Sequence, residues 1–316
     1  MSDLDFLFGK GGLQDAVKPV GAEPAQSLLT ALGLEGKSRR LGANEAFLLD
    51  AAPKGWLVLS GTLDLFLLSE SDTGPNDRQT RHHVLRVEAG GLALPLGGKA
   101  SSHFLAVPSN GAELVAFDWQ SLFRLATDAN FGDATTTALT EWLTRLAIAS
   151  AETRPPKIVQ LVDPSTALTL TEGHPIAINH GVCWLATEAT ASTLPKQEKK
   201  ATHIPMAPGL WIQPGADGQV QPLSIAAWSA TPQAANDLAA FQDYAVARIA
   251  AKAIARGEKE LQRVQAARQR RGTTFSSALA SLGGVLTSKR VPLVKLPKHP
   301  IAAAAMLVWR DMGLHI

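Results

Sequence analysis

Features typical of a secreted, membrane-spanning or disulfide-built protein are scarce in this chain. It has one cysteine, Cys183, so no disulfide can form within it, which fits a reducing compartment. The opening residues, Met1–Asp5, are acidic and lack the basic-then-apolar pattern of a secretory signal. No apolar run reaches the roughly 18 residues that a membrane span needs. We therefore expect these residues to lie in the cytoplasm, even where they are joined to a membrane protein.

Charge is also modest, and the remaining composition is typical of a folded chain. Charged residues make up 18% of the 316 residues and apolar ones 46%, whereas disorder needs the opposite balance. The net charge of +2 selects no class of partner. The length allows two ordinary domains, each with its own core.

Short apolar runs separated by turn-forming residues fill positions 41–117 and predict β-strands. The longest run, Gly55 to Leu68, predicts two strands joined by a tight turn at Ser60-Gly61. Another strand is expected from Arg81 to Gly91, and further turns at 73–77 and 108–111. Two helices should complete residues 41–150: Asp118 is placed to cap the first. The second, from about Thr135, carries an apolar face of Leu139, Trp142, Leu143 and Leu146.

Residues 151–230 are strand-like again, with apolar runs at 158–162, 167–170, 181–185 and 209–212. Between them lies a charged loop at 196–200. Trp184 corresponds in this region to Trp56 in the first. The pattern fits either a repeated β-roll or two unrelated β-domains.

A long basic helix is predicted over residues 231–285, beginning at Pro232. Its apolar side includes Leu238, Phe241, Ala245, Ile249 and Ala253. Its candidate surface for an anionic partner consists of Arg248, Lys252, Arg256, Lys259, Arg263, Arg268, Arg270 and Arg271. These cations form either a solvated face or a site for phospholipid headgroups or an acidic leader peptide. We expect no nucleic acid here, because aromatic side chains are not interleaved with the cations.

The two ends are read separately. Residues 1–40 form a lead-in with a short helix near 25–34, ended by Gly33 and Gly36. Residues 286–316 form a basic linker and an apolar helix that predicts the start of a following domain. The chain is therefore expected to be cut from a longer one.

One ordered set of residues resembles a known family. The pattern is Trp56-x-Val58-x-Ser60-Gly61-x-x-Asp64-x-Phe66, then Arg81-x-His83, then Gly90, with later matches at Trp184, Gly209-Leu210-Trp211, Trp228 and Phe241. It resembles the N-terminal region of ABC transporters that export bacteriocin-type peptides with nitrile-hydratase-like leaders. The resemblance covers roughly 45–316. It implies a cytoplasmic β-roll region followed by a degenerate peptidase-like domain, whose start would be residues 286–316. Transmembrane helices and an ATP-binding cassette would come next, and both lie outside this sequence.

Candidate chemistry within the chain is weak. The segment nearest to a phosphate loop, Leu94 to Ala100, has Ala93 where a glycine is needed and Ala100 where a hydroxyl is needed. A cyclic-nucleotide site would need an arginine in the region 90–116, which contains only Lys99 as a cation. His82 and His83 are adjacent, so on a strand they point to opposite faces and cannot readily share a metal ion. Cys183, between Val182 and Trp184, is expected to be buried and inert.

The predicted fold is α+β and mainly β: two cyclic-nucleotide-binding-like β-rolls with flanking helices and a long basic helix. We expect a regulatory or substrate-recruiting region of an ABC exporter, with the alternative of a free-standing sensor or scaffold with a degenerate roll. No cofactor is expected in this chain, and ATP and Mg²⁺ would belong to the separate ATPase domain. Expected partners are the precursor leader, the transporter's other domains or subunit, a dimer mate and an anionic membrane surface.

Overall fold

The computed structural model describes residues 22–42, 45–49, 54–69, 80–96, 102–151, 156, 158–187 and 201–287. The predictions for the start of the lead-in, the loops at 73–77 and 196–200, Lys99 and the C-terminal segment from 288 lie outside these residues. The chain divides into a compact unit through Ile254 and a second unit from Ala255. This division falls within one helix, α6 (Ala234–Thr287).

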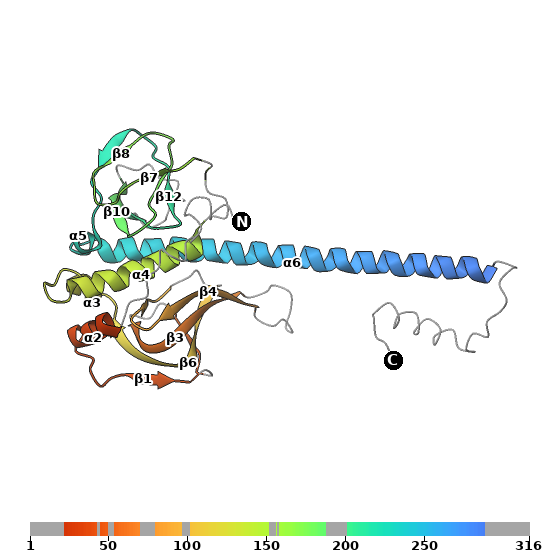
Figure 1. Cartoon of the computed structure of the whole chain (residues 1–316), viewed down its shortest axis with the longest axis horizontal. Helices are drawn as coiled ribbons and strands as arrows, with labels where there is room; N and C mark the ends of the chain where they lie inside the picture. The colour runs from red at the N-terminus through yellow and green to blue at the C-terminus, as the bar shows by residue number, and fades with distance from the viewer. Residues whose placement is uncertain are drawn as a thin grey trace. The chain divides into compact units, whose positions relative to one another are not determined.

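The first β region is a curled antiparallel sheet flanked by helices, as expected of a β-roll of the cyclic-nucleotide-binding type (Figure 1). Its main strands run in the order β1-β6-β3-β4, β2 pairs with β6, and β5 pairs with β3. Helix α2 (Ala22–Ala31) precedes it, and α3 (Ser121–Leu125) and α4 (Gly132–Ser150) follow. The strands are β1 (Arg39–Leu41), β2 (Phe47–Leu48), β3 (Lys54–Ser69), β4 (Thr80–Glu88), β5 (Leu92–Ala93) and β6 (Ser102–Asp118).

The turn predicted at Ser60-Gly61 is wrong: β3 continues through it as a single strand of 16 residues. The register of β3 against β6 shifts on both sides of Ser60, as it does at a β-bulge. Gly61 has φ +75°, and a Cβ on it would lie 2.6 Å from the carbonyl oxygen of Gly111. The turn predicted at 108–111 is wrong for the same reason, because these residues lie within β6. Turn-forming residues here bend two long strands rather than end them.

The helices predicted within the described residues are present, although α6 begins at Ala234, two residues after Pro232. The prediction that Asp118 caps the first helix is wrong: the N-cap of α3 is Gln120, with no capping hydrogen bond from a side chain. Asp118 instead accepts a hydrogen bond from the backbone N–H of Gln120 (3.1 Å). The apolar face predicted for α4 is buried in the core. On α6, the predicted apolar side through Ala253 is buried too, while the side chains from Ile254 to Lys259 are exposed. Among the described helices, none is long and apolar enough to cross a membrane.

The second β region is built from short strands in three small sheets, ordered β10-β11, β12-β9-β7 and β13-β8. A short helix, α5 (Ile225–Ser229), leads from it to α6. Its strands are β7 (Gln160–Leu161), β8 (Leu168–Leu170), β9 (Ile176–Ala177), β10 (Cys183–Ala186), β11 (His203–Met206), β12 (Trp211–Ile212) and β13 (Gly218–Val220). Trp184 and Trp56 differ in setting: Trp184 is fully buried, whereas Trp56 is partly exposed beside Phe47.

One hydrophobic core connects the first β region, α4, α5 and the buried face of α6, and it includes Trp184 from β10. A second, smaller core lies inside the second β region around Leu168, Ile178 and Met206. The two β regions therefore share a helical layer, and the second region also has a core of its own.

Candidate functional site

The two halves of the sequence motif meet at Asp64 of β3. Its carboxylate accepts hydrogen bonds from Arg86 Nε (2.8 Å) and Nη2 (3.1 Å), from Ser109 Oγ (2.6 Å) and from His83 Nε2 (3.0 Å). Arg86 and His83 stand on β4 and Ser109 on β6, so one carboxylate joins three strands. The Asp64 side chain is 8% exposed, whereas those of Arg86 and His83 are half exposed.

The charge of Asp64 is stabilised by these neighbours. Burial by itself would raise the pKa of Asp64, but hydrogen bonds from Arg86, Ser109 and His83 outweigh burial and lower the pKa from 3.8 to about 2. The bidentate, charge-assisted pair with Arg86 belongs to the strongest class of hydrogen bond among these contacts. A carboxylate so fully hydrogen-bonded is a poor general base. Its role is structural, because it links β3 to β4 and β6.

Other motif residues also have structural roles. Phe66 packs edge-on against the His83 ring, with centroids 5.3 Å apart. Gly90 has φ +89°, and its N–H donates to the carbonyl of Val58 on β3 (2.7 Å). Gly61 is required at the bulge described above. The motif therefore marks the positions that fold the roll, not a set of reacting groups.

A hollow of about 360 Å³ lies between α2, the turn after it and the β3–β6 pair. Its polar lining includes Glu113, Gln26 and Ser38, and no Lys or Arg is among the described residues that line it. A phosphate would need a cation there, so the lining does not suit a nucleotide.

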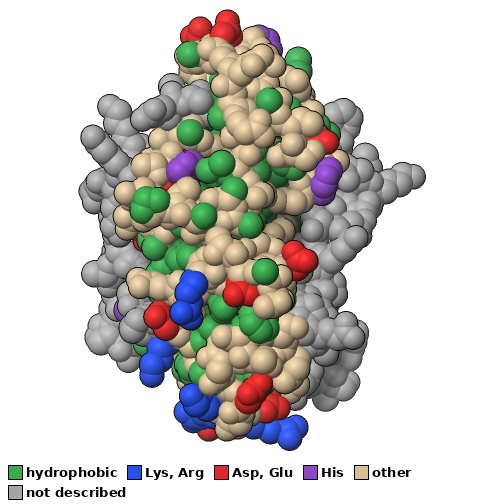
Figure 2. Space-filling model, turned by 90° about the vertical axis from the view of Figure 1, so that its left-hand side faces the viewer, with side chains coloured by type: hydrophobic (Ala, Val, Ile, Leu, Met, Phe, Trp, Pro, Cys, Tyr) green, Lys and Arg blue, Asp and Glu red, His purple; other side chains and the backbone are tan. Residues whose placement is uncertain are grey.

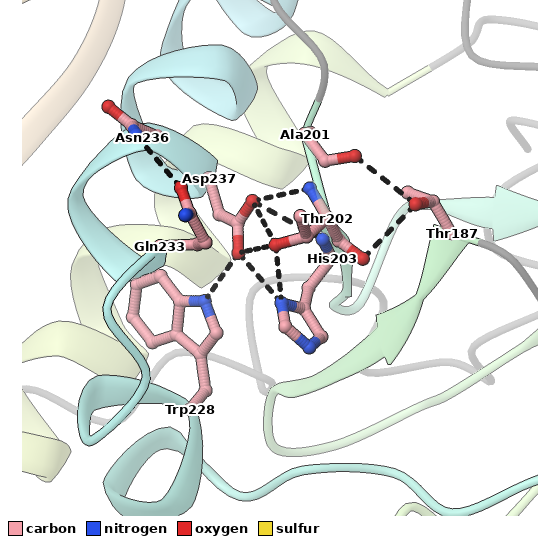
Figure 3. A network of polar contacts seen from close by, with 8 residues as sticks. All are labelled: Thr187, Ala201, Thr202, His203, Trp228, Gln233, Asn236 and Asp237. Carbon is pink, nitrogen blue, oxygen red and sulfur yellow. Dashed lines mark hydrogen bonds and ion pairs between the residues drawn. The ribbon is translucent and has the colours of Figure 1, made fainter.

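A second polar network is centred on Asp237, in the first turn of α6 (Figure 3). Its carboxylate is fully buried and accepts from the backbone N–H groups of Thr202 (2.8 Å) and His203 (3.3 Å). It also accepts from His203 Nδ1 (2.8 Å), Trp228 Nε1 (3.3 Å) and the hydroxyl of Thr202, which lies 3.2 Å from both oxygens. The network thus ties β11 and α5 to the start of α6.

The Asp237 network connects secondary-structure elements and does not form an active site. The His203 ring turns its second nitrogen away from Asp237 (Figure 3), and the cavity beside the pair holds only about 10 Å³, the size of one water molecule. Trp228 also stacks on Trp184, with ring centroids 3.9 Å apart and planes 6° apart. Sequence reasoning missed this network because its members are separated by up to 35 residues along the chain.

The predicted basic residues lie along α6 in different settings. In the first unit, Lys252 is half-buried and donates to the carbonyl of Ala149 in the last turn of α4 (2.9 Å). That contact places a cation at the negative end of a helix, so Lys252 has a structural role. Arg248 is half-buried as well. In the second unit, Arg256, Lys259 and Arg263 are exposed. Arg268, Arg270 and Arg271 lie within the helix, and their side chains are outside the described part of the chain.

The surface seen in Figure 2 carries charges of both signs. Lys and Arg side chains gather in its lower part with Asp and Glu among them, and acidic side chains also reach its upper end. This face therefore offers no single-signed surface to a charged partner.

The structure also places the residues weighed for metal and thiol chemistry. Within the described ranges, no three His, Cys, Asp or Glu side chains are grouped as a metal site requires. His82 pairs in register with Leu67, and His83 with Phe66. The prediction for Cys183 is confirmed: it is buried, and burial raises the pKa of its thiol to about 12.

Comparisons with known proteins leave the family open. No protein-family model matches the chain, and no curated protein does. Among solved structures, CprK complexed with OCPA aligns at 14% identity over 38% of this chain and 53% of its own, with a TM-score of 0.29. A cyclic nucleotide-binding domain containing protein from Listeria monocytogenes EGD-e aligns at 14% over 39% and 60% (TM-score 0.29). The CO-dependent transcription factor CooA from Carboxydothermus hydrogenoformans aligns at 15% over 39% and 56% (TM-score 0.24). The chain thus spans just over half the length of these structures, and the description of the β-roll rests on its own strand order.

Proposed function

We propose that this chain is the cytoplasmic regulatory and substrate-recruiting region of an ATP-driven ABC exporter of leader-bearing, bacteriocin-type peptides. The observation that carries the proposal is the contact between Asp64 and His83, which joins the two halves of the motif in one cluster. A motif whose separated parts meet in the fold is better evidence for a relationship than the same letters scattered over a surface. In this proposal the second β region is a second, smaller roll.

The described polar networks support a contact role rather than chemistry. The carboxylates of Asp64 and Asp237 accept hydrogen bonds from neighbouring side chains and backbone groups, and these serve to hold strands and helices together. ATP and Mg²⁺ would be bound by the exporter's ATP-binding cassette, and the chain would reach the membrane through its parent protein. It would then act by binding a peptide leader, a partner subunit or the ATPase.

Leader binding tests the proposal directly. A fluorescein-labelled leader peptide from a bacteriocin-type precursor is titrated with the chain, and fluorescence anisotropy reports the dissociation constant. We expect saturable binding in the micromolar range, with a scrambled leader of equal composition as the control. Failure to bind at several hundred micromolar would overturn the recruiting role.

A thermal-shift experiment tests the alternative of a free-standing nucleotide sensor. Cyclic nucleotides at a hundredfold excess over their dissociation constant would stabilise a binding protein by about 2.7 kcal/mol. We expect no shift, because residues 90–116 contain no arginine and the described lining of the hollow beside β3 and β6 includes Glu113 but no Lys or Arg. A clear shift with one cyclic nucleotide would favour the sensor.

A further inference from the structure

The second β region has an apolar strand edge without a described partner. This edge, residues 158–162, comprises β7 and its flanking residues and reads Ile-Val-Gln-Leu-Val. Among the described residues, four large apolar side chains are markedly exposed, and two of them belong to this edge: Ile158 at 81% and Leu161 at 48%. Such edges are unusual because they attract other strands.

The backbone of this edge is ready to pair. Gln160 N–H donates to the carbonyl of Pro175 (2.9 Å) and Val162 N–H to that of Ala177 (3.0 Å), so these two residues face β9. Alternation along a strand then turns the N–H and C=O groups of Val159 and Leu161 away from β9. In the part of the chain that the structure describes, nothing accepts from or donates to these four groups. They form a template for one more strand.

A longer edge strand of the first β region, β4, is protected. Its outward carbonyl at Arg86 accepts a hydrogen bond from Arg145 Nη1 (2.7 Å), and the strand carries Arg81, Arg86 and Glu88. Charge and cover are the usual means of keeping an edge from pairing. The edge at 158–162 has neither charge nor proline. The edge at 158–162 therefore lacks the protection that β4 has.

We propose that this edge binds an extended peptide segment with apolar side chains at alternate positions, which adds to the sheet as a strand next to β7. Ile158 and Leu161 lie on opposite faces of the strand, so apolar peptide residues would be covered on each side. The inference deepens the proposed function, and it rests on that function for the identity of the peptide as the exporter's leader-bearing substrate. Recognition by backbone hydrogen bonds suits a protein that must accept peptides of differing sequence.

A second copy of the chain fits this edge less well. Five residues of strand span about 17 Å, and one added strand is about 5 Å wide. That footprint is several times smaller than the roughly 800 Å² per partner of a stable protein interface. A peptide can bind to a footprint of this size, because its main-chain hydrogen bonds to the strand edge contribute to its affinity.

The test uses a fluorescein-labelled probe peptide, Lys-Val-Thr-Val-Thr-Val-Lys, and the whole chain. Anisotropy gives its dissociation constant for the wild type, for Leu161→Lys and for the matched control Leu48→Lys. Leu48 lies on β2 and is 50% exposed, so the two substitutions place the same charge on equally exposed positions. We expect Leu161→Lys to weaken binding at least tenfold and Leu48→Lys to change it less than twofold. Equal effects of the two substitutions would overturn the proposal.

Two further arms test the backbone contact and the occupant. Leu161→Pro removes one outward N–H and leaves the Gln160 and Val162 bonds to β9 in place, so it should also weaken the probe about tenfold. A probe with alternate amides N-methylated should not bind, and undiminished binding by it would refute strand addition. If light scattering shows a wild-type dimer that Leu161→Lys converts to a monomer, the occupant is a second copy and the peptide proposal fails.

The leader peptide separates this inference from the proposed function. If the leader binds wild type and Leu161→Lys equally, the recruiting role stands and this edge is not its site. If the probe binds at the edge and the leader does not bind at all, the edge stands and the recruiting role fails.

Discussion

Replacing Asp64 with asparagine should lower the free energy of unfolding by about 2 kcal/mol at neutral pH. The pKa of Asp64 is lowered from 3.8 to about 2, and each pKa unit corresponds to about 1.36 kcal/mol. Asparagine keeps the size of the side chain, and its carbonyl can still accept from Ser109. It cannot hold the charge that pairs with the Arg86 guanidinium, so the charge-dependent part of the stabilisation is lost.

The stabilisation by Asp64 should decrease as the pH falls. Because the folded state binds the Asp64 proton more weakly than the unfolded state, the stabilisation is complete well above pH 3.8 and disappears as the pH falls toward 2. At pH 3 about 1 kcal/mol of it should remain. The difference between wild type and Asp64→Asn should therefore shrink on acidification.

Urea unfolding followed by circular dichroism at pH 7, 5, 4 and 3 measures this difference. Asp163→Asn is the control, because Asp163 is exposed and its pKa is lowered mainly by hydrogen bonds from nearby Ser165. It should change stability far less than Asp64→Asn. A stability difference that stays constant from pH 7 to pH 3 would show that the Asp64 charge does not stabilise the fold.

Three further outcomes follow from described contacts. Gly61→Ala should lower the free energy of unfolding by about 3 kcal/mol, because Gly61 has a positive φ and an added Cβ would lie 2.6 Å from a backbone oxygen. Gly111→Ala should lower it by only about 1 kcal/mol, because Gly111 has φ +70° but open space around it. Equal melting temperatures for the two variants would contradict the close packing at the bulge. Asp237→Ala should cost about 3 kcal/mol or more in chemical denaturation, because it leaves buried donors such as Trp228 Nε1 without an acceptor; a loss below about 1 kcal/mol would mean that the network is dispensable. Cys183 should react with Ellman's reagent only after unfolding, since burial raises its pKa to about 12, and fast labelling of the native protein would refute its burial.

The sequence was a good guide to the elements and a poor guide to how they are joined. Apolar spacing located α4 and the buried side of α6, because a helix that packs against a core repeats its apolar residues every three or four positions. Ser60-Gly61 misled because the same residues that permit a turn also permit a bulge. What decides between them is Gly111, fifty residues later, whose carbonyl closes on Gly61.

The Asp237 network could not be predicted from the sequence for a related reason. An aspartate in the first turn of a helix is expected from the helix dipole alone. Nothing local in the sequence reveals that the same carboxylate also binds β11 and the indole of Trp228. A tryptophan shortly before a predicted helix, followed by an aspartate in its first turn, is the only signal that could have pointed to this contact.

The core shared by the first β region, α4, Trp184 and the first five turns of α6 has a consequence for how this protein can be handled and how it can evolve. A fragment ending at residue 230 would lose the helix that covers this core, and the apolar side chains that Leu238 and Phe241 cover would be exposed to water. Neither β region should therefore be obtainable alone by limited proteolysis or by dividing the gene at that point. Residues 22–254 would be exchanged, inherited and degraded as a single piece.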